Sequence, residues 1–157
     1  VSRSGGILQV VSTTKTDTFT SSSTSFVDIT GLSATITPRS TSSKILVMAS
    51  VSSGNTSSEQ YGFRFMRDAT PIAVGDAAGS RTLTTIGAYF GSSVSNYHLS
   101  TLTSQVLDTP GTTASVTYKV QGATNAATFT INRNGADLDV STVRRAVSTI
   151  TLMEVAG

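Results

Sequence analysis

The chain has 157 residues, a length that suits one domain with a real hydrophobic core. It contains no cysteine and a single histidine, His98. Disulfides, zinc–thiolate sites, iron–sulfur clusters, cysteine nucleophiles and two-histidine metal motifs are therefore excluded. Eleven basic and nine acidic residues give a net charge of +2, and 25 Ser and 27 Thr supply the polarity that charges do not.

Apolar and polar residues alternate along most of the chain, most clearly over 32–37, 61–66, 115–120 and 128–132. A period of two places one set of side chains on a buried face and the other set in water. Residues that favour turns, mainly Gly, Pro, Asn and Asp, separate these segments. Strands are predicted at 7–12, 16–20, 25–29, 32–37, 44–52, 60–67, 70–75, 82–91, 96–107, 114–121, 127–133 and 146–155.

Helical periodicity is weak throughout, and many short strands at regular spacing are typical of an antiparallel sandwich or barrel. We predict an all-β fold, an antiparallel β-sandwich that is jelly-roll-like. The alternation continues to Val155, and no linker divides the chain. We therefore expect a single β-sandwich domain over 1–157, in which 1–6 form a short N-terminal lead.

Catalytic chemistry finds little support in the sequence. His98 lies in Ser95-Asn96-Tyr97-His98-Leu99-Ser100, and the chain has no Gly-x-Ser-x-Gly motif. A surface or strand-edge histidine is the favoured interpretation. Nine carboxylates could supply a glycosidase pair, but tryptophan is absent and the aromatic residues fall at core positions of strands. We predict that the protein is not an enzyme and uses no cofactor.

Three other segments have a functional and a structural interpretation. Oxygen-bearing side chains alternate around a glycine in Asn132–Asp139, as in a calcium loop, while the alternative is an Asn-Gly hairpin turn. Whether a calcium site exists near Asn134–Asp139 is left open. The pair Arg144-Arg145 is interpreted as a solvated turn. The segment Tyr61–Arg67 mixes aromatic and basic residues, but its alternation favours a core strand over a nucleic-acid surface.

The basic residues are scattered, so no polybasic arm for nucleic acid or anionic lipid is present. The longest apolar run, Ile45–Ala49, is far too short to cross a bilayer, which needs about 20 residues. The N-terminus also lacks the pattern of a signal peptide. We expect no membrane and no nucleic acid among the partners, and synthesis in a reducing cytoplasm.

Several segments, taken together in order, carry a resemblance to a known kind of protein. They are Gly6–Val11, Lys15–Phe19, Phe26–Leu32, Thr37-Pro38, Ser42–Val47, Val74–Arg81, Leu107–Gly111, Tyr118–Gln121, Ile131–Arg133 and Ser148–Val155. This series resembles a β-rich module of tailed bacteriophages, often found at the distal end of tail-fibre-like proteins. The resemblance implies a non-enzymatic virion protein that forms a homotrimer, and it brings no catalytic residues with it.

A tail fibre usually carries an attachment segment and a shaft before such a module, and only Val1–Gly5 precede it here. We therefore expect a trimeric capsid decoration, or cement, protein at the virion surface that stabilises the icosahedral head and binds the major capsid protein. The alternative is a tail-fibre head that joins tail proteins and binds a host surface glycan or protein. A secreted carbohydrate-binding module is a third class, and the missing signal peptide argues against it.

Overall fold

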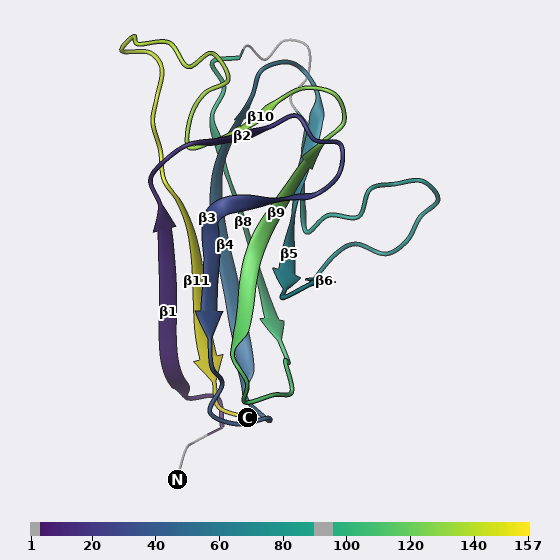
Figure 1. Ribbon diagram of the computed structural model, residues 1–157, viewed down its shortest axis with the longest axis vertical. Coiled ribbons are helices and arrows are strands. Elements are labelled where there is room, and N and C mark those ends of the chain that lie inside the picture. The colour runs from purple at the N-terminus through teal and green to yellow at the C-terminus, as the bar shows by residue number, and fades with distance from the viewer. Residues whose placement is uncertain (1–3, 90–95) are drawn as a thin grey trace.

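The computed structural model describes residues 4–89 and 96–157, and within them the chain forms strands and loops without a helix. Figure 1 shows the strands stacked in two layers, with β3 and β9 in front of β4 and β8. The strands are β1 (Ile7–Lys15), β2 (Phe19–Ser21), β3 (Val27–Ile36), β4 (Lys44–Asn55), β5 (Gln60–Arg67), β6 (Thr70–Ile72), β7 (Ile86–Tyr89), β8 (Ser100–Asp108), β9 (Val116–Thr124), β10 (Phe129–Ile131) and β11 (Ser148–Val155).

All strand pairs are antiparallel, and they form two sheets. One sheet has the order β1-β11-β4-β8, extended by the short strands β10 and β2, and we call it the first sheet. The other, the second sheet, has the order β3-β9-β5, with β6 and β7 both pairing with β5.

The eight main strands pair as a jelly roll. The first pairs with the last (β1 with β11), the second with the seventh (β3 with β9), the third with the sixth (β4 with β8), and the fourth with the fifth (β5 with β7). This nested pairing is what a folded-over antiparallel ribbon produces. The predicted all-β, jelly-roll-like sandwich is confirmed.

The inner faces of both sheets enclose one hydrophobic core. Phe63 and Tyr61 from β5 pack edge-on at 5.6 Å between ring centroids, and Phe63 meets Phe129 of β10 edge-on at 5.7 Å. Edge-to-face contacts of this kind add to the energy of burying the rings. The Tyr61 hydroxyl reaches Ser53 Oγ at 2.9 Å, so its polar end has a partner inside the core.

Some predicted strand boundaries are wrong for local reasons. The segments 25–29 and 32–37 belong to one strand, β3, whose pairing with β9 shifts register between Asp28 and Ser33. Gly31 has a φ of +82°, a conformation that glycine adopts without strain, so it marks an irregularity inside the strand. β1 likewise runs on to Lys15, beyond the predicted end at residue 12.

Several other strand predictions are too long, among them 82–91 and 127–133. The strand predicted at 82–91 begins only at Ile86, because residues 73–85 form a loop that extends away from the sandwich; its last two residues lie outside the described part of the chain. The strand predicted at 127–133 shrinks to Phe129–Ile131, since Asn132 turns the chain with a φ of +62°.

The two ends of the described chain meet at one end of the sandwich. The Gly5 N–H donates to the Ala156 carbonyl, and the Ala156 N–H donates to the Gly6 carbonyl, both at 2.8 Å. Beside them the carboxylate of Glu154 is fully buried. It accepts hydrogen bonds at 2.6 Å from the Arg39 backbone N–H and from Gln9 Nε2. Burial raises the pKa of Glu154, but the nearby Ser43 hydroxyl, followed by the Arg39 N–H and Gln9, outweighs burial and holds the pKa below its usual value.

We expect Glu154→Gln to lower the free energy of unfolding by about 2 kcal/mol at pH 7, because charge-assisted hydrogen bonds are lost at a buried site. A depressed carboxyl pKa stabilises the fold above the ordinary value of 4.5, and this contribution is lost as the pH falls through the folded-state pKa. Urea unfolding of both proteins should therefore show a gap that shrinks below pH 4.5. A gap that stays constant down to pH 2 would contradict the assignment; Glu59→Gln is the control.

Candidate interaction surface

His98 lies just before β8, at the edge of the first sheet, as the sequence interpretation had it. Its Nε2 is 2.6 Å from Oγ of Ser100, the first residue of β8. Ser100 in turn pairs with Ser53 of β4. Within residues 4–89 and 96–157, no three His, Asp or Glu side chains come together in a way that could hold a metal ion.

The segment Asn132–Asp139 forms part of a long loop, and its amide oxygens serve the protein itself. Asn132 Oδ1 accepts a hydrogen bond from Ser148 Oγ at 2.6 Å, and Asn134 Oδ1 accepts one from the Arg144 N–H at 2.7 Å. Asp137 forms an ion pair with Arg145 at 2.6 Å. Three of the side chains considered as calcium ligands, Asn132, Asn134 and Asp137, therefore already have partners within the protein.

The Asn-Gly hairpin turn is wrong. The chain stays open from Arg133 to Arg145, which pair across the loop as an isolated bridge. Gly135 is needed for a different reason: a Cβ there would lie 2.2 Å from the backbone oxygen of Asn55. The loop therefore packs directly on the end of β4. Arg144 and Arg145 were predicted to lie in a solvated turn. They are exposed, but they also cross-link this loop, Arg144 through its N–H to Asn134 and Arg145 through its ion pair with Asp137.

The segment Tyr61–Arg67 is a core strand, as predicted. Tyr61, Phe63 and Phe65 are at most 3% exposed and face the other sheet. Arg64 points to the outer face, where its guanidinium lies 4.1 Å from the ring centroid of Phe26 and donates two hydrogen bonds to Gln121 Oε1. Met66 was expected on a wet face, but it is buried at 4% exposure between Pro71 and Lys119, its partners in register.

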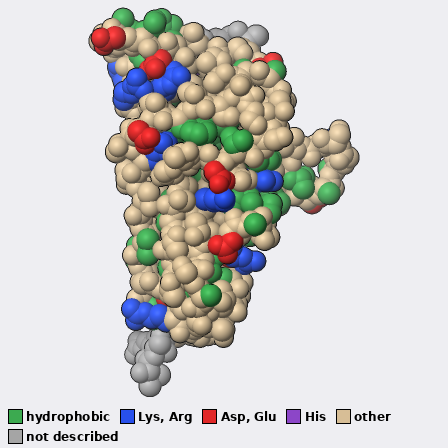
Figure 2. Space-filling model, viewed as in Figure 1, with side chains coloured by type: hydrophobic (Ala, Val, Ile, Leu, Met, Phe, Trp, Pro, Cys, Tyr) green, Lys and Arg blue, Asp and Glu red, His purple; other side chains and the backbone are tan. Residues whose placement is uncertain are grey.

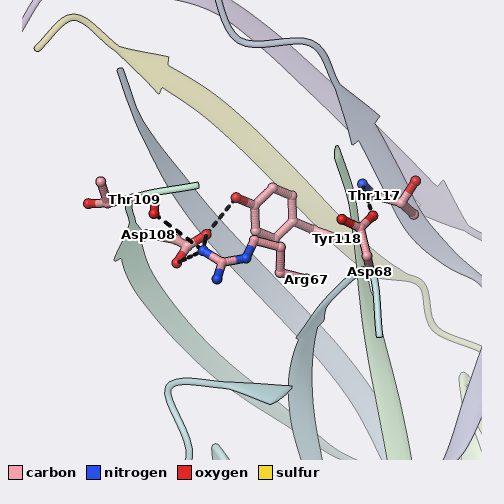
Figure 3. Close-up of polar contacts among 6 residues, drawn as sticks. All are labelled: Arg67, Asp68, Asp108, Thr109, Thr117 and Tyr118. Atoms are coloured by element: carbon pink, nitrogen blue, oxygen red, sulfur yellow. Dashed lines mark hydrogen bonds and ion pairs between the residues drawn. The ribbon is translucent and has the colours of Figure 1, made fainter. Parts of the chain in front are cut away.

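A polar cluster closes the gap between the two sheets where β8 ends (Figure 3). Both carboxylate oxygens of Asp108 accept from Nη1 of Arg67, at 3.0 Å, and Oδ2 also accepts from the Tyr118 hydroxyl at 2.7 Å. Tyr118 is fully buried. Burial, followed by the contact with Asp108, raises the pKa of Tyr118, so its hydroxyl keeps its proton and acts as a donor. One carboxylate thus links the first sheet to two strands of the second.

The outer face of the first sheet carries no charged side chain over most of its length. Alternate residues of β1, β11, β4 and β8 point outward, and the strand pairing aligns them in rows. We call this surface the uncharged face. It consists of Val10, Ser12, Thr14, Leu46, Met48, Ser50, Thr101, Thr103, Gln105, Leu107, Thr149, Thr151 and Met153.

The uncharged face has an apolar ridge and a hollow. Val10, Met153, Leu46 and Leu107 are aligned across four strands and form the ridge. Val10 is 54% exposed and Leu107 is 49% exposed, so the described residues leave both ends of the ridge uncovered. The hollow, of about 590 Å³, lies next to it over Met48, Ser50 and Thr151 and their neighbours.

The outer face of the second sheet is different, because charges of both signs lie on it. The Asp28 carboxylate accepts hydrogen bonds from Lys119 Nζ and Gln121 Nε2, both at 2.7 Å. These contacts lower the pKa of Asp28, and the contact with Lys119 contributes most. In Figure 2, which views the molecule from the side of β3 and β9, acidic and basic side chains lie next to one another. The two outer faces of the sandwich are thus chemically distinct.

A cleft of about 760 Å³ lies on the outer side of β5 and β7. Gly62 and Gly87 pair directly and form its floor, with Ala123 of β9 beside Gly62. Tyr89, at 62% exposure, stands at one side of the cleft, and the end of the loop 73–85 lines another.

A comparison with models of known protein families finds no match to this chain, and a comparison with curated proteins finds none either. Within the described residues, no helix is long and apolar enough to cross a membrane.

Neither the uncharged face nor the cleft on β5 and β7 could be located from the sequence. The uncharged face combines residues from strands that begin at residues 7, 44, 100 and 148, and each strand alone reads as an ordinary alternation. The signal that could have found it is that Lys44, at the start of β4, is the one Asp, Glu, Lys or Arg at an outward position of these four strands. Recognising that signal needs the pairing order, which the sequence does not supply.

Proposed function

We propose that this chain is a non-enzymatic structural protein of a bacteriophage virion, which forms a homotrimer through the uncharged face and decorates the capsid as a cement protein. The observation that carries the trimer is the ridge of Val10, Leu46, Leu107 and Met153, aligned across four strands on a face without charges. Depletion of charged residues is typical of the core of a protein interface. The phage assignment rests on the sequence resemblance.

Copies of the same chain suit this face better than a charged partner does. A face without charge offers no electrostatic complement to a charged surface, but it meets its own copy without like-charge repulsion. Four strands about 4.8 Å apart and about eight residues long give a face of roughly 500 Å² in projection. That is of the order of a standard interface, which buries about 800 Å² of accessible surface per partner.

The ridge and the hollow also suit a closed ring. In a threefold ring each copy contacts its neighbours through two different patches, so the surface must carry two complementary shapes. The aligned apolar side chains of the ridge form one patch, and the hollow of about 590 Å³ beside them forms the other. Such a trimer turns the second sheet, with its charges and its cleft, toward the outside.

The shell partner would be the major capsid protein, bound at the virion surface. A second candidate is the tail-fibre head that binds a host receptor, and the cleft on the outward-facing second sheet favours it. Both candidates require the same trimer. They differ in where the trimer sits and in how many copies a particle carries.

Particles that lack this protein test the proposal. For a cement protein, bare particles should assemble but break at lower temperature, and added protein should restore resistance with many copies bound per head. Binding only to the assembled shell stabilises it by about 2.7 kcal/mol per site when the free protein exceeds Kd a hundredfold. Unchanged shell stability, with the protein seen only at the tail and adsorption lost, would replace cement with the fibre head.

A further inference from the structure

The cleft on the second sheet has a floor without side chains. Gly62 of β5 and Gly87 of β7 are direct partners, and Ala123 of β9 is the next residue in the same row. A Cβ at Gly62 would lie 2.5 Å from Cγ2 of Thr84, so the loop residue Thr84 closes over this glycine and forms one end of the cleft. At Gly87, the nearest atom to an added Cβ is Thr84 Oγ1, at 3.6 Å, so this part of the floor is open.

The lining is polar and nearly neutral. Hydroxyl and amide side chains surround the floor, among them Thr24, Gln60, Thr82 and Asn125, and the lining residues that the structure describes include no carboxylate. Arg81 is the one charged side chain among the described lining residues. Its Nη1 donates to the Ala78 carbonyl at 2.9 Å, which holds the guanidinium at the rim. Its remaining N–H groups can serve a ligand, since a guanidinium has five donors.

Tyr89 adds an aromatic surface to this polar lining. It pairs with Gln60, two residues along from the glycine pair and on the same face of the sheet, and it is 62% exposed, whereas most strand aromatics of this protein are buried. An aromatic ring has a negative face that attracts C–H groups, and its hydroxyl can hydrogen-bond at the edge. By contrast, the aromatic residues of the neighbouring strand β5, Tyr61, Phe63 and Phe65, are all buried.

We propose that this cleft binds a short saccharide, with one sugar ring stacked on Tyr89. A volume of about 760 Å³ lies within the range of ligand sites, which is roughly 300–1,000 Å³. A sugar presents C–H groups on its ring face and hydroxyls around its rim, which matches an aromatic surface surrounded by hydroxyl and amide groups. Arg81, without a carboxylate beside it in the lining, favours a sugar that carries a carboxylate, such as a uronic acid.

This inference names a ligand class for the cleft that favours the tail-fibre candidate, and it does not depend on the cement proposal or on the trimer. The cleft lies on the second sheet, and the uncharged face lies on the first, so a trimer formed through the uncharged face leaves the cleft open. The two proposals are therefore tested by different measurements, saccharide binding for one and oligomeric state for the other.

The test uses the full chain and a panel of soluble oligosaccharides, half of them neutral and half containing uronic acids, followed by calorimetric titration of the best binder. We expect binding to at least one uronic-acid oligosaccharide. Tyr89→Ala should weaken it about tenfold, and Arg81→Ala should remove the preference for acidic over neutral sugars. Tyr97→Ala, which removes another exposed tyrosine outside the cleft, should change nothing.

Gly87→Val tests the position of the ligand, because it fills the floor of the cleft without removing any side chain that could bind the sugar. Valine favours strands, and the space at Gly87 admits a Cβ, so the fold is retained while the floor of the cleft is filled. Binding should be lost in this variant, with thermal unfolding and oligomeric state as in the parent protein. Binding that survives both Gly87→Val and Tyr89→Ala places the ligand elsewhere and overturns the proposal, as does a panel in which no saccharide binds.

Discussion

Met48→Glu is expected to convert the protein from a trimer to a monomer. Met48 lies on the outer side of β4, in the middle of the uncharged face, aligned with Thr151 and Gln105 on the neighbouring strands. In a monomer the new carboxylate meets water and costs little. In a trimer three carboxylates would enter an interface with no positive side chain, and such unpaired, like charges cost several kcal/mol. We expect association at least about 100-fold weaker.

Light scattering coupled to size exclusion measures this directly. The parent protein should have three times the chain mass of 16.2 kDa, and Met48→Glu should have the mass of one chain at the same concentration. Thr35→Glu is the matched control, because Thr35 is exposed on β3, on the outer face of the second sheet. A parent protein that is monomeric at high concentration rejects the trimer, and a trimer that tolerates Met48→Glu but not Thr35→Glu moves the interface to the second sheet.

The alternation of the sequence predicted which residues form the core, because a period of two is a local property. Leu32, Ala34 and Ile36 face inward as the pattern requires, and so do Tyr61, Phe63 and Phe65. The same reasoning misplaced Met66, since alternation cannot tell a wet outer face from one that a neighbouring strand has covered.

Buried polar residues were the other failure of the sequence interpretation. Asn132 was considered as a calcium ligand, yet it is fully buried and satisfies three backbone or hydroxyl groups. Its Nδ2 donates to the carbonyls of Lys15 and Asp17, at 2.8 and 2.9 Å, and its Oδ1 accepts from Ser148. These partners lie 16 to 117 residues away in the chain, so no local motif marks the role. An amide at positive φ looks the same in sequence whether it binds a metal or a distant strand.

The role of Asp108 is a second case that no local sequence motif reveals, and its substitution is expected to have a large effect on stability. In sequence, Asp108 is the start of a turn, Asp-Thr-Pro-Gly, and one of nine carboxylates. In the fold it is the acceptor that joins Arg67 and Tyr118 across the sandwich (Figure 3). Its side chain is 12% exposed, so water cannot fully replace it.

We therefore expect Asp108→Ala to lower the free energy of unfolding by about 3 kcal/mol, because it leaves the buried Tyr118 hydroxyl without its acceptor and the Arg67 guanidinium without its counter-charge. Tyr118→Phe should cost about 1 kcal/mol, since it removes a single hydrogen bond. Asp68→Ala is the matched control: this neighbouring carboxylate is exposed and accepts only the Thr117 N–H among the described contacts, at 2.9 Å. Its loss, including the strain of alanine at the φ of +51° of this residue, should cost about 1 kcal/mol.

Urea unfolding of the parent protein and of the Asp108→Ala, Tyr118→Phe and Asp68→Ala variants separates these effects. All four carry Met48→Glu, so that dissociation of the trimer does not contribute to the measured free energy of unfolding. The Arg67→Ala and Asp108→Ala pair completes a double-mutant cycle, and the two substitutions together should cost clearly less than their sum, because each removes the same ion pair. Additive costs, or an Asp108→Ala protein no less stable than Asp68→Ala, would mean that the two sheets are held at this end by the apolar core alone. A coupled cost would instead establish that the Asp108 carboxylate, at the end of β8, stabilises the contact between the two sheets. Asp108 follows directly after Leu107, which points to the opposite side of β8 and belongs to the exposed apolar ridge.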